Sequence, residues 1–404
     1  MILTIPDEYR DKVELIETTD SRTDEEIISS LLEYKPVTSE KNVWAYWHSG
    51  LSNMPKWNQR NVIDWVRILG PEWTIRVLDS IPGSINNILQ FIPESIMPPA
   101  FIDRTMDGPF VGQHGADLTR TACLYEHGGV WMDVGSFLMR HLDRVCWKEL
   151  EDPKSPYKVA IFMLWGLAGG NFFVAARKKD PLIFQWHRLF SYIWGDKKSI
   201  EGSLSHPLIA PILPQFAEHM SESFDYDWIN FDVALSYATQ IICLTRLFCL
   251  EENENGEDGQ AFSGVDYWRN HVLALDGGEE TARVEWQRTF VGWGQRALDM
   301  LTLPCSGPDA DPTSTKYKEA ETMVWDMLAN STIWKVTHAQ GLTHTPQLGV
   351  LLDMPENESK DVTPNTFGEL LRYGSTHLRQ KREHVARFPK REPTVTWKKG
   401  VLEP

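Results

Sequence analysis

Three charged residues in one segment of the chain, Asp117, Arg120 and Asp133, have side chains that can bind oxyanions or cations, although their spacing alone does not show a chemistry. A guanidinium donates paired, planar hydrogen bonds to carboxylate or phosphate oxygens. A carboxylate supplies a hard oxygen ligand to a divalent cation. On a helix, Asp117 and Arg120 would lie about one turn apart on the same face. The structural alternative is a plain helix-surface ion pair, which would stabilise the helix by only about 0.2–0.5 kcal/mol.

The sequence around these residues predicts a helix followed by a buried strand. Residues 117–126 have the apolar spacing of a helix, and Gly128 and Gly129 suit its end, where the backbone needs positive φ. Residues 130–132 are apolar and predict a strand that ends at Asp133. Ligands of open α/β sheets bind at the carboxyl ends of the strands, so the placement of Asp133 indicates a ligand site.

The rest of the pattern predicts an α/β fold. A strand from residue 42, a helix over 54–70 and a strand at 73–79 have the spacing of a βαβ unit, which predicts a parallel sheet. We therefore expect a mostly parallel sheet flanked by helices, with helical additions at the N- and C-terminal ends. The remaining predictions are two strands separated by a glycine-rich turn over 159–181, a helix at 181–194, a longer buried helix at 230–248, helical segments near 281–303 and 317–330, and a strand within 332–339.

Three segments are predicted along the chain. Residues 1–40 are acidic and polar, with one helix-like stretch and no strand, and are interpreted as an N-terminal helical extension. Residues 41–350 are interpreted as one α/β domain, because no linker or internal repeat interrupts them. Residues 351–404 are polar and rich in lysine, arginine and proline, and are interpreted as a C-terminal extension.

Composition and charge argue against several partners. The 404-residue chain has a formal net charge of −16, whereas nucleic acids and anionic membranes attract basic surfaces. No apolar stretch of about 18 residues predicts a membrane span, and the N-terminus has no signal-peptide pattern. The five cysteines are few, odd in number and without pattern, which favours free thiols in a reducing compartment. We expect a cytoplasmic protein with no nucleic acid partner and no membrane span.

The segment ADLTRTACLYEHGGVWMDVGSF resembles the donor-site segment of the capsular polysaccharide synthesis proteins and of the related family 32 glycosyltransferases. Those proteins show a D-x-x-R-x-x-x-L-x-x-x-G-G-[IV]-[WY]-x-D run. The likeness covers roughly residues 42–340 and weakens after about residue 250. The sequence matches the run in register at Asp117, Arg120, Leu124, Gly128, Gly129, Val130, Trp131 and Asp133.

The resemblance implies a GT-A fold and a function. A hexose would pass from a UDP- or GDP-sugar to an acceptor hydroxyl, with retention of configuration, and the acceptor would be a small molecule or a glycan. Asp117 and Arg120 would hold the donor sugar and its diphosphate. Asp133 would be the first aspartate of a D-x-D motif, bound to the ribose or to a metal that bridges the diphosphate. These three residues are therefore the candidate catalytic group.

Further residues are candidates for the two substrates. Trp47 and Tyr46 come just after the first strand, where they would lie against the nucleobase, and the alternative for both is plain core packing. Asn171, Asp227 and Asp232 are candidates for the acceptor side. The alternative for these three is helix capping or hydrogen bonding within a loop.

One position departs from the family pattern and bears on the metal. A full D-x-D motif has a second carboxylate where this chain has Gly135. The resemblance still implies Mn²⁺ or Mg²⁺ at Asp133, with His338 as a candidate further ligand; a lone histidine is otherwise structural. The incomplete motif leaves two alternatives. One is a repurposed, non-catalytic domain, and the other is a cyclase or isomerase that acts on an aromatic or hydrophobic small molecule.

Overall fold

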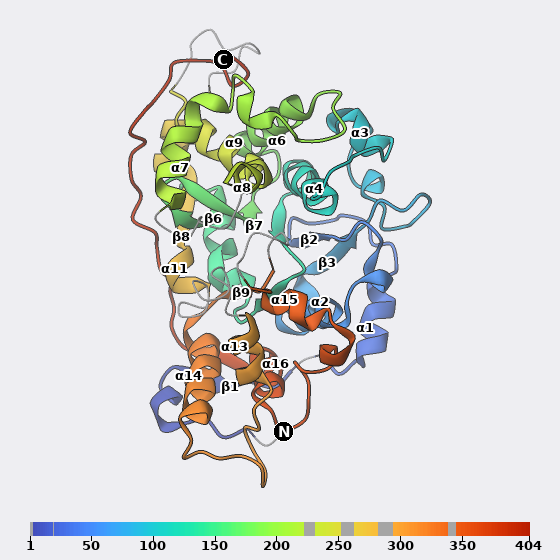
Figure 1. Cartoon of the computed structure of the whole chain (residues 1–404), viewed down its shortest axis with the longest axis vertical. Helices are drawn as coiled ribbons and strands as arrows, with labels where there is room; N and C mark the ends of the chain where they lie inside the picture. The colour runs from blue at the N-terminus through green and yellow to red at the C-terminus, as the bar shows by residue number, and fades with distance from the viewer. Residues whose placement is uncertain (1–2, 19, 222–230, 252–261, 282–293, 338–344) are drawn as a thin grey trace.

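A six-stranded sheet runs through the centre of the computed structural model (Figure 1). The structure describes residues 3–18, 20–221, 231–251, 262–281, 294–337 and 345–404. The strand order is β3-β2-β4-β7-β6-β8, and within this sheet β7 alone runs antiparallel to its neighbours. The predicted mostly parallel α/β sheet is confirmed. Its strands are β2 (Asn42–Tyr46), β3 (Thr74–Leu78), β4 (Gly129–Met132), β6 (Val159–Trp165), β7 (Ala168–Ala176) and β8 (Val272–Asp276).

Side chains along the strands alternate between two hydrophobic cores. In β2, Val43 and Ala45 face one core, and Trp44 and Tyr46 face the other, as the two-residue period of a strand requires. Both faces of the sheet are therefore covered by helices, which is typical of parallel sheets. One core is shared with α4 (Val111–His127), α6 (Pro181–Trp194), α9 (Thr239–Phe248) and α10 (Gly264–His271), and the other with α1 (Asp24–Leu31), α2 (Lys56–Leu69) and α5 (Lys148–Glu151).

The two predicted helices nearest the candidate site are α2 and α4. α2 ends where Gly70 takes a φ of 60°, a conformation that glycine adopts without strain. α4 begins at Val111, earlier than predicted, although its first turns hold two glycines. Tertiary packing overrides their low helix propensity, since His114 in this stretch is only 3% exposed. The end of α4 is as predicted, with φ of 69° at Gly128 and 108° at Gly129.

Gly129 should not tolerate a side chain. Its φ is +108°, and a Cβ there would lie 2.5 Å from the Asn42 carbonyl oxygen and 3.0 Å from that of Glu40. We expect Gly129→Ala to lower the free energy of unfolding by about 2–4 kcal/mol, since backbone strain and overpacking add. Gly83 is the control, because its φ is +74° and nothing lies within 4 Å of a Cβ there. Urea unfolding should show a smaller loss for Gly83→Ala; equal losses would contradict this account.

N-terminal residues and the helices of residues 294–377 meet in a third hydrophobic core in the lower part of the molecule, whereas the C-terminus itself lies at the top (Figure 1). β1 (Val13–Leu15) pairs antiparallel with β10 (Leu378–Gln380). The prediction that residues 1–40 contain no strand was therefore wrong, because a three-residue strand with so distant a partner leaves no local pattern. The predicted segment boundaries stay a prediction. The third core is built mainly from α13 (Gly294–Leu301), α14 (Thr315–Asn330), α15 (Leu348–Leu352) and α16 (Phe367–His377).

Several other elements follow the sequence prediction with changes. The single helix predicted at 230–248 is two helices, α8 (Phe231–Tyr237) and α9, interrupted at Ala238. The Thr239 hydroxyl donates to the Ser236 carbonyl oxygen, 2.7 Å away, a local bond that competes with helix continuation. The strand predicted within 332–339 is β9 (Ile333–Lys335), which pairs antiparallel with β5 (Ser136–Leu138). The remaining α-helices are α3 (Pro99–Ile102), α7 (Leu213–Ser221) and α11 (Gly277–Glu280).

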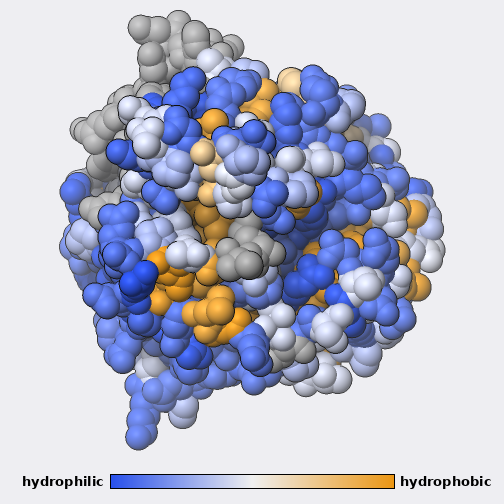
Figure 2. All heavy atoms as spheres, turned by 90° about the horizontal axis from the view of Figure 1, so that it is seen from below, coloured by the Kyte–Doolittle hydropathy of each residue, from blue (hydrophilic) through white to orange (hydrophobic). Residues whose placement is uncertain are grey.

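Seen from below, the molecule is mostly hydrophilic, with apolar residues gathered near the middle of that face (Figure 2). Over the residues that the structure describes, no helix is both long and apolar enough to cross a bilayer.

Candidate active site

A pocket of about 340 Å³ lies at the carboxyl ends of the parallel strands β2 and β4. Trp47 follows β2 and Asp133 follows β4, so the parallel pairing brings both residues to the same edge of the sheet. Pockets of about 300–1,000 Å³ are usual for small-molecule sites. The pocket therefore lies where the sequence places a ligand site, at the strand end that Asp133 marks.

Asp117, Arg120 and Asp133 meet in this pocket. The Arg120 side chain is 2% exposed, and its Nη1 donates to Asp117 Oδ1 at 2.6 Å. Its Nη2 donates to Asp133 Oδ1 at 3.2 Å. The guanidinium also lies over the Trp131 ring, 5.0 Å from the centroid. Arg120 thus bridges the two carboxylates. The i, i+3 pair with Asp117 forms, but it is buried and shared with Asp133, unlike a plain surface ion pair.

Asp133 is held by cations on both of its oxygens. The Lys335 ammonium contacts Oδ2, while Arg120 and the Trp131 indole N–H, the latter at 2.8 Å, donate to Oδ1. Burial would raise the pKa of Asp133, but the charges of Lys335 and Arg120 outweigh it and hold the pKa below its ordinary value. Asp133 is therefore an ionised carboxylate at neutral pH, neutralised by the protein itself.

The acceptor-side candidates have different positions. Asn171 lies on β7, and its amide donates to Asp117 Oδ1 and to Gln240 Oε1, both at 3.0 Å. It lines the pocket beside the charged cluster. Asp232 is exposed on the first turn of α8 and is not among the pocket-lining residues. Asp227 lies outside the described residues. The structure therefore brings Asn171 to the cluster and leaves Asp232 away from it.

Aromatic side chains form the other part of the pocket. Trp47 is half-buried, and within the described chain its buried indole N–H has no hydrogen-bond partner. Tyr46 is 8% exposed, its hydroxyl is hydrogen-bonded to the Ser80 hydroxyl, and burial raises its pKa to about 12. Trp57 donates its indole N–H to Asp353 Oδ1 at 2.8 Å. Of the two nucleobase candidates, Trp47 is the one with an unused polar group, whereas Tyr46 is largely core.

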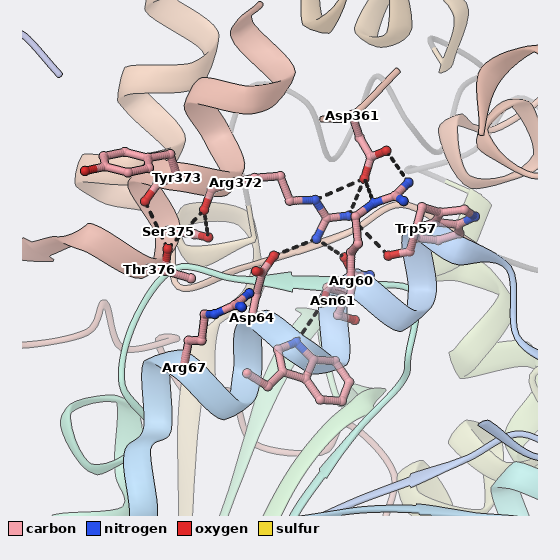
Figure 3. A network of polar contacts seen from close by, with 12 residues as sticks. Trp57, Arg60, Asn61, Asp64, Arg67, Asp361, Arg372, Tyr373, Ser375 and Thr376 are labelled. Atoms are coloured by element: carbon pink, nitrogen blue, oxygen red, sulfur yellow. Dashed lines mark hydrogen bonds and ion pairs between the residues drawn. The ribbon is translucent and has the colours of Figure 1, made fainter. Parts of the chain in front are cut away.

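The loop after Asp133 is fixed by α2. The Asn61 amide donates to the Val134 carbonyl oxygen at 2.8 Å, and the Trp65 indole donates to that of Ser136 at 3.1 Å. Arg372 on α16 reaches across to α2 and donates to Asn61 Oδ1 at 2.7 Å (Figure 3). The C-terminal helical part of the chain is thereby connected, through one buried asparagine, to the residue next to Asp133.

Arg372 is also the centre of a buried ion-pair network. It lies 2.8 Å from Asp64 Oδ2 and 2.6 Å from Asp361 Oδ2, and its side chain is 7% exposed. Arg60 forms a second ion pair with Asp361, at 2.5 Å, so that α2 contributes both a cation and an anion (Figure 3). The network therefore joins α2 to α16 and to the segment before it.

The described residues do not fit a divalent cation. No group of three or more His, Cys, Asp or Glu side chains in the described ranges could hold a metal. Asp133 has both oxygens engaged by cations and an indole N–H, whereas Mg²⁺ and Mn²⁺ need several free oxygen ligands. His338 falls in the undescribed stretch 338–344, so its ligand role stays a prediction.

Two residues of the cluster have no counterpart in the sequence prediction. Lys335 is a charged residue in a strand whose other members, Ile333 and Trp334, are fully buried. Gln240 is 1% exposed in α9 and contacts Arg120 and Asn171 through Oε1. A polar residue inside an otherwise apolar strand or helix was the available signal, because such a group needs a partner when it is buried.

Comparison with known proteins identifies the family. The sequence profile of the capsular polysaccharide synthesis proteins matches residues 8–209. The chain is 44% identical over its whole length to the probable glycosyltransferase FCK3 of Fusarium pseudograminearum, and the match covers 100% of both chains. The chain belongs to the capsular polysaccharide synthesis protein family. Two further glycosyltransferases match this chain over nearly its whole length.

Those relatives agree on the class of reaction. The O-glycosyltransferase braB of Annulohypoxylon truncatum is 37% identical over 95% of this chain and 91% of its own. The glycosyltransferase afumC of Aspergillus fumigatus is 40% identical over 92% of this chain and 93% of its own. The family resemblance drawn from residues 117–133 is confirmed, and the activity class is glycosyl transfer.

Proposed function

We propose that this glycosyltransferase moves a hexose from a nucleoside-diphosphate sugar to a hydroxyl of a small apolar molecule, on a GT-A-type fold. The observation that carries the proposal is the composition of one pocket. Its one part holds the cluster of Arg120, Asp133 and Lys335, where positive charge can meet phosphate oxygens. Its other part holds Trp47 and Trp57. The charged residues would bind a diphosphate, and the tryptophans would bind an aromatic base or acceptor.

The donor fits the charged part. A departing diphosphate develops negative charge, and fixed cations in a partly dry pocket stabilise such charge far more than water does. Arg120 is 2% exposed at its side chain and Lys335 is 8% exposed. The half-buried ring of Trp47, which lines the pocket, would stack on the base. UDP and GDP are the nucleotides we propose.

The acceptor is proposed from the apolar lining. Tyr237, Ile241 and Val350 extend the aromatic side of the pocket, and none of them is charged. A hydroxylated apolar molecule would bury more surface here than a glycan, whose many hydroxyls need polar partners. The relative braB is named an O-glycosyltransferase, which supports a hydroxyl as the accepting group. The five free thiols support the proposal that the enzyme acts in a reducing, cytoplasmic compartment.

Retention of configuration is proposed together with this site. Asp117 and Asp133 are paired with cations, so neither is a good general base, and the departing diphosphate would take the acceptor proton. Inversion of configuration would need a general base, and Asp353 is the pocket carboxylate that favours this outcome. Partial burial raises its pKa, which suits a base, and the hydrogen bond from the Trp57 N–H opposes that rise. Inverted product that disappears in Asp353→Asn would identify Asp353 as a base and contradict retention.

A thermal-shift and product assay tests the function. UDP or GDP at about 100 times its Kd should stabilise the protein by about 2.7 kcal/mol. Mass spectrometry should then detect glycosylated product from a panel of apolar alcohols, and Asp133→Ala should abolish it. No shift with any nucleotide would favour the non-catalytic alternative. Conversion of an aromatic substrate without nucleotide, unaffected by Asp133→Ala, would favour the cyclase or isomerase.

A further inference from the structure

The strand β9 and the residues just after it pack against Gly135, the position of the missing second carboxylate. Ser136 pairs with Lys335 in the β5–β9 ladder, and the Val336 N–H donates to the Gly135 carbonyl oxygen at 3.0 Å. A Cβ at Gly135 would lie 2.1 Å from the Thr337 hydroxyl oxygen. Real Cβ atoms do not approach other atoms so closely, so an aspartate at position 135 would displace Thr337. The packing of Thr337 therefore leaves no room for a second carboxylate at position 135.

The same strand brings a cation to the first carboxylate. Lys335 Nζ contacts Asp133 Oδ2 and lies 5.4 Å from the centroid of the Phe172 ring. The lysine side chain is 8% exposed and lines the pocket. An ammonium has three donors, and within the part of the chain that the structure describes Lys335 makes one hydrogen bond, to Asp133. Its remaining N–H groups are available to phosphate oxygens in the pocket.

We propose that Lys335 takes the place of the divalent cation, so that donor binding and sugar transfer need no metal. This inference rests on the proposed function. The Lys335 ammonium, oriented by Asp133, would bind the donor diphosphate directly. A lysine acts there as a compact point charge, and Arg120 adds a second positive charge from the other side of Asp133.

The transfer step balances without a metal. The bond between the anomeric carbon and the diphosphate oxygen breaks, and its electron pair leaves with the diphosphate. The acceptor oxygen forms the new bond to the anomeric carbon, and its proton passes to the departing diphosphate. Lys335 keeps its proton throughout and stabilises the developing negative charge through hydrogen bonds. Asp133 positions the ammonium and is not consumed.

Nucleotide titration calorimetry tests this inference. UDP and GDP are titrated into the wild type in EDTA and, separately, in Mn²⁺. We expect Kd values that agree within about threefold, because the charge on the diphosphate is met by the protein. Lys335→Met should weaken binding by about 10- to 100-fold in both buffers, since it removes hydrogen bonds from a charged donor. Lys335→Arg should retain part of the affinity.

The controls are the variants Lys179→Met and His338→Ala and the wild type compared in the two buffers. Lys179→Met is the matched control, because Lys179 pairs with Glu126 at 2.6 Å on the surface, and its nucleotide affinity should be unchanged. Binding that needs Mn²⁺, is lost in EDTA and is lost in His338→Ala would overturn the inference while leaving the proposed function intact. Failure of both nucleotides to bind in either buffer would overturn the proposed function and this inference together. The wild-type comparison remains decisive if Lys335→Met fails to fold.

Discussion

Replacing Arg120 by methionine should be among the most damaging single changes in this protein. The guanidinium is 2% exposed and bridges Asp117 and Asp133. Removing one partner of a buried ion pair leaves an uncompensated charge and typically costs about 3–5 kcal/mol. Lys335 still neutralises Asp133, so the loss falls mainly on Asp117. We expect Arg120→Met to lower the free energy of unfolding by that amount, and glycosyl transfer to fall by about 10²- to 10³-fold at temperatures where the variant is folded.

A double-mutant cycle separates the buried charge from the lost packing. In Asp117→Asn/Arg120→Met the carboxylate is absent, while the new amide oxygen can still accept from Asn171, and Gln240 still donates to the main-chain carbonyl oxygen at position 117. The double variant should therefore be more stable than Arg120→Met alone, with a coupling of about 0.5–3 kcal/mol. Urea unfolding of the four proteins measures this. Stability of Arg120→Met within about 1 kcal/mol of the wild type would contradict the bridge.

Arg372→Met should be comparably destabilising, although it lies outside the pocket. Its guanidinium pairs with Asp64 and Asp361 and donates to Asn61, which in turn holds the Val134 carbonyl (Figure 3). Loss of a buried partner again predicts about 3–5 kcal/mol of destabilisation. Because Asn61 loses one of its two anchors, the loop after Asp133 should loosen, and nucleotide affinity should fall even where the variant is folded.

Arg379→Met is the matched control for this prediction. Arg379 also forms an ion pair, at 2.6 Å from Glu14, but its side chain is 54% exposed. Exposed pairs contribute only about 0–1 kcal/mol. Chemical unfolding should therefore show a large loss for Arg372→Met and a small one for Arg379→Met. Similar losses for the two variants would mean that the buried network does not stabilise the fold as described.

The fold could be predicted where its signals are local. The helix, glycine pair and strand of residues 117–132 form one continuous segment, so spacing alone predicts their order and the placement of Asp133. The βαβ unit before it is equally local. β1 could not be predicted, because its partner β10 lies at the other end of the chain. The break between α8 and α9 depends on a single side-chain hydrogen bond of Thr239, which apolar periodicity does not reveal.

The candidate site could likewise be predicted only where its signals are local. Sequence register places Asp117, Arg120 and Asp133 in one segment, and in the structure Arg120 pairs with both carboxylates. Their role at the donor stays a prediction. Lys335 reaches Asp133 only because β9 pairs with β5, a long-range pairing that no motif encodes. The family resemblance also implies a metal at Asp133. Lys335 bears on this prediction because its ammonium contacts Asp133 Oδ2, an oxygen that a metal would need. The roles of Asp227 and His338 stay predictions, since both lie outside the described residues.

A crystal structure with UDP or GDP tests the central claim most directly, because a further cavity among the described residues is also lined by cations. The pocket beside Asp133 is about 340 Å³, and a second cavity of about 420 Å³ is lined by Arg67, Arg144 and Arg379. We predict the diphosphate within hydrogen-bond distance of Lys335 Nζ, with the base against Trp47. A nucleotide bound in the second cavity, or a diphosphate out of reach of Lys335, would contradict the account.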